Sequence, residues 1–106
     1  MSDFTPLRIT TEASPDVWRV VAAGELDIGG IPALEQAMGA AYDAEAGQVV
    51  LDLAAVTFID SSGIRVLVDA AAAARDAGGR QFTIVSSDAV DRVIELSGLR
   101  DHLPFG

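Results

Sequence analysis

Three successive residues that often begin helices, Asp60, Ser61 and Ser62, stand between an apolar run and Gly63. One helix start requires only one capping side chain. One interpretation is that Asp60 or one serine caps a helix while the others fill the turn. The other is that a hydroxyl remains free, because no glutamate or glutamine lies three positions beyond any of them to form a capping box.

A free hydroxyl beside Gly63 would be open to the active site of another protein. The backbone N–H groups and dipole of a helix start also tolerate the charge that phosphorylation adds, roughly −1.5 to −2 near neutral pH. Next to Asp60, and to Asp27 if that residue is close, this charge would change the surface sharply. Acid and hydroxyl together therefore indicate a two-state binding switch.

Hydrolysis by one of these serines is the competing chemistry. A catalytic triad needs a base, but the single histidine is His102 in the tail, and no Gly-x-Ser-x-Gly motif occurs. Spacing marks no carboxylate pair among the 16 acids, which we expect at helix caps and on solvated helix faces. We predict no catalytic residue and a surface or cap position for His102.

Composition narrows the remaining chemistry. All seven cations are arginines, so mechanisms that require lysine, such as Schiff-base formation or a P-loop lysine, are excluded. The net charge of −9 disfavours nucleic acid, and the absence of cysteine excludes thiol nucleophiles and zinc knuckles. With one histidine, we predict neither a metal site nor a cofactor.

The length of 106 residues suits one domain over residues 1–106. The N-terminus, Met1 to Phe4, lacks the basic and apolar segments of a signal peptide, and no run approaches the roughly 20 apolar residues of a membrane span. We therefore expect a cytoplasmic protein without a membrane partner.

Periodicity predicts the first half of the fold. Residues 7–12 alternate as in a half-buried strand, and a turn at 14–16 leads to a second, antiparallel strand at 17–22. Helical spacing over 31–41 follows, stopped by Gly47. Residues 49–53 read as a central parallel strand buried on both faces, with Asp52 near its end.

The second half continues with a helix over about 62–77 that stops at Gly78-Gly79, a strand at 81–85 and a third helix capped within 86–88 and ended by Gly98. The tail is expected to dock Leu103 and Phe105. The predicted inward residues of the two helices are Ile64, Leu67, Val68, Ala71 and Ala72, and Val90, Val93, Ile94 and Ser97. The run Ala70 to Ala74 reads as helix filler or as a surface that lets a partner approach closely.

The predicted order β-β-α-β-α-β-α gives an α/β fold: a small mixed sheet with helices mainly on one face. Because carboxyl ends of adjacent parallel strands share a rim, Asp27, after Gly24-Glu25-Leu26, is expected near Ser61. The alternative is a simple turn with Asp27 solvated. Arg65 either pairs weakly with Asp69 or faces a partner.

Three segments together resemble the STAS domain and, more narrowly, the bacterial anti-sigma factor antagonists. The segments are Gly24-Glu25-Leu26-Asp27, the run Val49 to Leu53 leading into Val56-Thr57-Phe58-Ile59-Asp60-Ser61-Ser62-Gly63, and Arg92-Val93-Ile94-Glu95-Leu96-Ser97-Gly98-Leu99. They occur in the family's order over nearly the whole chain. The resemblance implies a curved sheet with helices largely on one side.

The resemblance also implies a partner-switching role. The unmodified antagonist would bind an anti-sigma factor that is a serine kinase of the histidine-kinase-like ATPase type, and so free the sigma factor. Phosphorylation of Ser61 would weaken the complex, and a PP2C-type phosphatase would reset it; ATP and magnesium belong to the kinase. The residues implied in the loop and kinase-binding surface are Asp27, Asp60, Ser62, Gly63, Ile64 and Arg65.

Two departures bear on partner choice. Ile64-Arg65 replaces the family's frequent Leu-Gly, and the loop 28–32 is richer in glycine than usual. Two other functions remain open at this point. One is a STAS regulatory subunit of a lipid-transport or signalling complex, with an unmodified serine. The other is a nucleotide sensor, for which the chain offers no glycine-rich phosphate cradle or lysine.

Overall fold

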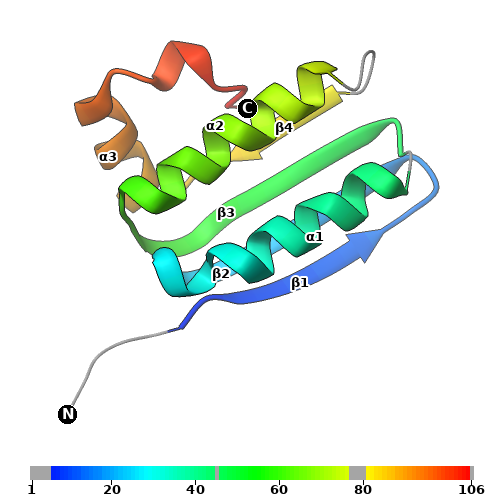
Figure 1. The fold of residues 1–106 in the computed structure, drawn as a ribbon, viewed down its shortest axis with the longest axis horizontal. Coiled ribbons are helices and arrows are strands. Elements are labelled where there is room, and N and C mark those ends of the chain that lie inside the picture. The colour runs from blue at the N-terminus through cyan, green and yellow to red at the C-terminus, as the bar shows by residue number, and fades with distance from the viewer. Residues whose placement is uncertain (1–5, 45, 77–80, 106) are drawn as a thin grey trace.

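The computed structural model describes residues 6–44, 46–76 and 81–105 (Figure 1). The elements in chain order are β1 (Arg8–Ala13), β2 (Val17–Leu26), the 3-10 turn η1 (Ile28–Gly30), α1 (Ile31–Asp43), β3 (Gln48–Ile59), α2 (Ser61–Asp76), β4 (Gln81–Val85), α3 (Asp88–Ser97) and the 3-10 turn η2 (Arg100–His102). This confirms the predicted β-β-α-β-α-β-α order. The predicted stop at Gly78-Gly79 lies outside the described residues.

The four strands form one mixed sheet in the order β1-β2-β3-β4. β1 pairs antiparallel with β2, whereas β2 with β3 and β3 with β4 are parallel. At the β1–β2 turn, the Ser14 amide donates to the Val17 carbonyl at 2.9 Å, as the predicted tight turn requires. Helices α1 and α2 lie side by side over one face of the sheet (Figure 1), which confirms the predicted architecture.

The two central strands are longer than the sequence pattern predicts, since β2 reaches Leu26 and β3 reaches Ile59. Gly24 makes this extension feasible because its φ of 105° lies in the left-handed region, at a register shift between Gly24 and Glu25. Beyond the shift, Leu26 pairs with Ile59. Both strands therefore deliver their loops to one rim.

The prediction that Asp52 lies near a strand end is wrong. Asp52 lies within β3, between the buried Leu51 and Leu53, and its side chain points to the sheet face opposite theirs. There its carboxylate accepts a hydrogen bond from the Arg19 guanidinium at 2.6 Å and another from the Ala54 amide at 2.9 Å. The ion pair makes a carboxylate tolerable within a central strand.

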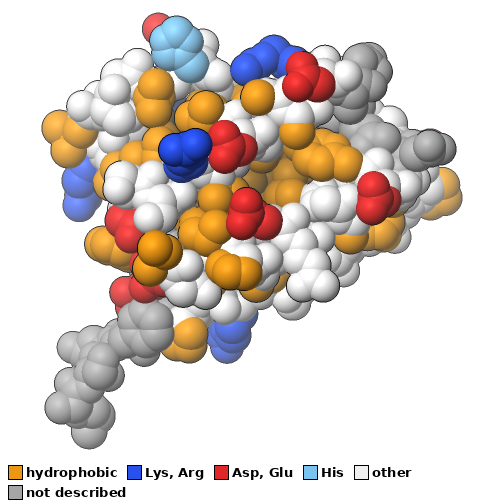
Figure 2. All heavy atoms as spheres, in the orientation of Figure 1, with side chains coloured by type: hydrophobic (Ala, Val, Ile, Leu, Met, Phe, Trp, Pro, Cys, Tyr) orange, Lys and Arg blue, Asp and Glu red, His pale blue; other side chains and the backbone are white. Residues whose placement is uncertain are grey.

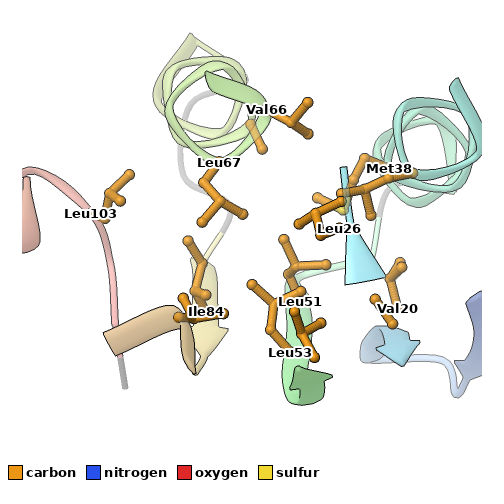
Figure 3. Close-up of a cluster of buried hydrophobic side chains, with 14 of the residues drawn as sticks. Val20, Leu26, Met38, Leu51, Leu53, Val66, Leu67, Ile84 and Leu103 are labelled. Carbon is orange, nitrogen blue, oxygen red and sulfur yellow. The ribbon is translucent and has the colours of Figure 1, made fainter. Parts of the chain in front are cut away.

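The hydrophobic core lies between the sheet and the two covering helices (Figure 3). Buried strand residues Val20, Leu51 and Ile84 pack under Met38 of α1 and Leu67 of α2. In α1 the buried positions are Leu34, Met38 and Ala41, as the helical spacing predicts. Fully burying a leucine or isoleucine contributes roughly 1.5–3 kcal/mol, so this layer supplies much of the driving force for folding.

The buried face of α2 differs from the predicted one. Val68 is 37% exposed, and the buried residues missed by the prediction are Val66, Ala70 and Ala74. The reason is that α2 packs against α1 as well as the sheet: the Tyr42 hydroxyl donates to the Ala70 carbonyl at 2.8 Å. Small alanines permit this close approach between helices, so much of the alanine run fills the interior.

The tail docks as predicted. Leu103 is buried in the core, and half-buried Phe105 forms a parallel bridge with Ile84 of β4. The Arg100 guanidinium lies 5.4 Å from the centre of the Phe105 ring. These contacts hold the C-terminal segment against β4 and α2.

Helix α3 begins and ends where its capping residues predict. The Ser87 hydroxyl accepts from the Val90 amide and donates to the Val56 carbonyl at 2.7 Å, while Gly98 ends the helix with a φ of 74°. Val90 and Ile94 are buried, Val93 is half-buried, and Ser97 is exposed rather than inward.

Asp91 ties α3 to both of its chain neighbours. Its carboxylate accepts from the Ser86 hydroxyl at 2.6 Å and from the Arg100 guanidinium at 3.1 Å. The Ser86 hydrogen bond, followed by the contact with Arg100, lowers the pKa of Asp91. A lowered folded-state pKa means that the charged form stabilises the fold.

We predict that Asp91→Asn lowers the unfolding free energy by about 0.5–1 kcal/mol near pH 7, a small value because the side chain is 34% exposed. The loss should be full above the carboxyl's usual pKa of about 3.9 and should shrink below that value. It should disappear as pH falls through the lowered folded-state pKa of Asp91, because the parent side chain is then as uncharged as asparagine. Urea unfolding from pH 3 to 7 measures this, with the exposed Asp101→Asn as control. A pH-independent difference would contradict the assignment.

Candidate functional site

A single residue, Asp60, separates β3 from α2. Its carboxylate accepts from the Gly63 amide at 3.1 Å, and its carbonyl accepts from the Ile64 amide at 3.1 Å. These are the two hydrogen bonds of an N-cap residue. Of the three candidate capping residues, Asp60 is thus the one that caps the helix.

Ser61 and Ser62 are the first two residues of α2. Ser61 is exposed and Ser62 is half-buried. Within the described part of the chain, neither hydroxyl takes part in a hydrogen bond. The helix start therefore presents an accessible hydroxyl at Ser61 that its own capping does not use.

Gly63 is buried where the first turn of α2 touches the ends of the two central strands. A Cβ at this position would lie 2.7 Å from Ile59 Cγ1, 2.9 Å from Leu26 Cγ and 3.1 Å from the Leu26 carbonyl oxygen. Such contacts are too short for any side chain. Gly63 therefore shapes the loop by allowing close packing. Because it is buried and has no side chain, it does not itself provide contact surface for a partner.

The neighbouring loop, after β2, lies on the same rim. The Asp60 amide donates a hydrogen bond to the Leu26 carbonyl at 3.4 Å, and Leu26 pairs with Ile59. Asp27 and Asp60 are thus the first residues after two strand ends that lie side by side. This confirms that the two loops share one edge of the sheet. Asp27 is half-buried and caps η1, accepting from the Gly29 amide at 3.0 Å.

The glycine-rich departure in this loop has a packing cause. A Cβ on Gly30 would lie 2.8 Å from Leu7 Cδ2 and 2.9 Å from Leu7 Cβ. Leu7 packs against the core, so Gly30 lets the residue that precedes β1 close one side of it. The loop is therefore shaped by the fold as well as by any partner.

Three residues around Ser61 and Asp27 offer contact surface. Arg65 has a side chain that is 82% exposed, with Asp69 its ion-pair partner at 3.9 Å, and Ile64 is half-buried. Ile28, which the sequence reasoning missed, is 75% exposed immediately after Asp27. The available signal was a large apolar residue placed next to glycine in a predicted turn.

A second large residue missed by the sequence reasoning is Phe58, which is 45% exposed. It sits in the apolar run that precedes Asp60 in the sequence. Because the next residue, Ile59, points into the core, Phe58 points to the opposite face of the sheet. It therefore lies at the same end of the sheet as Ser61 but on its other side.

His102 lies elsewhere. With Ala74 and Arg75 it lines a hollow of about 440 Å³ between the second half of α2 and the tail, whereas Ser61 begins α2. Among the described residues, no three acidic or histidine side chains gather as a metal site would require. Nor is any helix in the described ranges long and apolar enough to cross a membrane.

Comparison with known proteins identifies the family. The family model described as "Mlab, STAS domain" matches residues 9–104. The chain belongs to the STAS domain family. This match spans β1 to the docked tail and therefore includes every element that builds the rim around Ser61.

Individual relatives of this STAS domain carry regulatory names. This chain is 27% identical over 95 residues to the anti-sigma-B factor antagonist of Staphylococcus epidermidis, and the match covers 90% of this chain and 88% of that one. It superposes on the crystal structure of an anti-sigma factor antagonist from Mycobacterium paratuberculosis with a TM-score of 0.81 and 31% identity, over 94% of this chain and 85% of that one.

A more distant structure shows the shared fold. The phosphorylated form of the Bacillus cell fate determinant SpoIIAA superposes with a TM-score of 0.69 at 17% identity, over 93% of this chain and 91% of that one. At this identity, the likeness supports the fold assignment alone. The sheet order and helix placement described above are therefore those of the STAS fold.

We predict opposite effects for two alanine substitutions at glycines. Gly63→Ala should destabilise the STAS domain by about 1–3 kcal/mol, because the new methyl group overlaps Leu26 and Ile59. Gly39→Ala, in the middle of α1 with nothing within 4 Å of the new Cβ, should stabilise it by up to about 1 kcal/mol. Urea unfolding measures both. A neutral or stabilising Gly63→Ala would argue against the close contact at Gly63, and a destabilising Gly39→Ala would contradict the open space at Gly39.

Proposed function

We propose that this STAS domain is an anti-sigma factor antagonist whose binding is switched by phosphorylation of Ser61. The supporting observation is the exposed Ser61 hydroxyl beside Asp60, which has no hydrogen-bond partner within the described chain. The names of the Staphylococcus and Mycobacterium relatives supply the class of partner. The chain is then a substrate and binding module, and the catalytic chemistry belongs to its partners.

Ser61 is a better phosphoacceptor than Ser62 on physical grounds. A kinase must bring the hydroxyl oxygen in line with a bound phosphate, which requires an exposed side chain. Ser61 is exposed, whereas Ser62 is half-buried. Because Asp60 supplies the cap, a phosphate on Ser61 leaves the first turn of α2 intact.

The proposed contact surface consists of the side chains around Ser61. Asp27 and Ile28 contribute from the β2 rim, and Ile64 and Arg65 from α2. Asp60, through its cap, and Gly63, through its close packing, hold the loop in shape. In the unmodified form, this surface offers apolar contact and one cation to the partner. A phosphate next to Asp60 would place about two further negative charges at the contact and require their desolvation on binding.

The proposed partner is an anti-sigma factor that is also a serine kinase of the histidine-kinase-like ATPase type. Binding of the unmodified antagonist would release the sigma factor, and a PP2C-type phosphatase would restore that form. ATP and Mg²⁺ would be held by the kinase, so the antagonist needs no cofactor. These partners act on transcription, which would place the antagonist in the cytoplasm.

A Ser61→Ala variant should incorporate no phosphoryl group when incubated with the cognate kinase, Mg²⁺ and ATP. Ser62→Ala is the matched control and should be modified like the parent, because its hydroxyl is not the acceptor. Intact-mass measurement gives the stoichiometry. If Ser61→Ala still gains one phosphoryl group, the proposed acceptor is wrong.

A Ser61→Asp variant should bind the unmodified kinase partner about tenfold more weakly than the parent, or about 1.4 kcal/mol. Aspartate adds one charge where phosphate adds nearly two, so this loss is a lower bound for phosphorylation. Ser61→Asn matches the size without the charge and should bind within about threefold of the parent. Equal affinities of the Asp and Asn variants, measured by calorimetry, would show that charge at position 61 does not control binding.

Affinity capture from native extract separates the alternative functions. Recovery of a histidine-kinase-like ATPase supports the proposed antagonist. Recovery of a membrane transporter ATPase would instead favour the regulatory subunit of a lipid-transport complex. Bound nucleotide without either protein would favour a sensor.

A further inference from the structure

We propose that Arg65 binds the phosphate of phosphorylated Ser61 within the same helix, so that modification withdraws this arginine from the partner surface. The inference rests on the proposed modification of Ser61. It assigns Arg65 a different role in each state.

The spacing of charges along α2 carries the first step. Ser61 and Arg65 are four residues apart, which places them next to each other on the helix surface. A negative group N-terminal to a positive group at this spacing is the favourable order. Arg65 and Asp69 have the same spacing in the reverse, less favourable order.

The present partner of Arg65 holds it weakly. The Arg65 Nε lies 3.9 Å from Asp69 Oδ2, and the two side chains are 82% and 65% exposed. Exposed pairs at this separation contribute little to stability. A phosphate carries more charge than Asp69 and three acceptor oxygens, which the planar guanidinium can engage through two N–H groups at once. The guanidinium is therefore expected to leave Asp69 for the phosphate.

The two loops and the start of α2 contain no competing cation. Over residues 24–31 and 57–69, which form the two loops and the start of α2, Arg65 is the sole lysine or arginine. The nearby Asp27 and Asp60 are acids and repel the phosphate. Arg65 is thus the group in these segments that can offset the new charge.

This pairing changes what the partner meets. In the unmodified form, Arg65 is exposed and can contact an acidic group of the kinase. In the phosphorylated form, the same side chain would be turned back along α2. One modification would then add negative charge and also remove a positive contact, so Arg65→Gln should reduce the fold-loss of affinity on phosphorylation.

The test installs phosphoserine at position 61 during translation, without any kinase, and follows the phosphate by ³¹P NMR from pH 4 to 9. The ordinary second pKa of phosphoserine is about 6. We expect the parent value to be a few tenths of a unit below that of Arg65→Gln, the size that a surface pair at this spacing implies. Arg75→Gln is the control: it makes the same charge change about 21 Å from Ser61 along the same helix. Its phosphate pKa should match that of the parent.

A second signal reports on Arg65 itself. Its Nε–Hε resonance should shift with the phosphate titration in the phosphorylated parent and should not do so in the unmodified protein. Equal phosphate pKa values in the parent and Arg65→Gln, equal shifts in both arginine variants, or an Nε–Hε signal insensitive to the phosphate would each overturn the inference.

The two proposals fail separately. A kinase that does not modify Ser61 removes the proposed function, while the translated phosphoprotein still shows whether Arg65 binds the phosphate. Conversely, if the phosphate does not bind Arg65, the proposal that a kinase phosphorylates Ser61 still stands.

Discussion

The contact between the first turn of α2 and the end of β2 is the constraint on which the candidate site depends. Position 63 has no room for a side chain, because Leu26 and Ile59 occupy the space. This lets α2 begin after a single linking residue and fixes its first turn against two paired strand ends. The register shift at Gly24 serves the same arrangement by bringing Leu26 opposite Ile59. Ser61 is exposed on the rim because the backbone around it is held this closely.

Within that turn, capping and presentation are carried out by different residues. Asp60 satisfies the amides of the helix start, so the Ser61 hydroxyl is not consumed by the fold. If Ser61 were the cap, modification would remove a structural hydrogen bond and the two forms would differ in stability. With Asp60 in that role, the two forms can keep one backbone and differ in surface charge. A binding switch of this kind requires little conformational change.

The sequence predicted the order of elements and the family because both depend on local, repeated signals. Alternation marked β1, helical spacing marked α1, and Ser87 and Gly98 marked the ends of α3. The errors came from contacts between distant segments. Asp52 is tolerated within β3 because Arg19 of the neighbouring strand pairs with it, and Val66 is buried because α2 packs on α1. Neither partner can be deduced from the periodicity of one segment.

The candidate site was predictable in its position and less so in its surface. Asp27 and Ser61 come to one rim because parallel strands end together, a rule that needs only the strand order. The exposure of Ile28 depends on how η1 turns, and the cause of the glycine at position 30 is the distant Leu7.

Charge must also act locally here. Screening at physiological ionic strength limits exposed charges to a range of about 8 Å, so a change in net charge from −9 to about −11 matters only near the modified serine. If Ser61 is phosphorylated as proposed, the effect on binding is therefore governed by groups within that range, and Arg65, four residues along α2, is a cation that the chain itself places there.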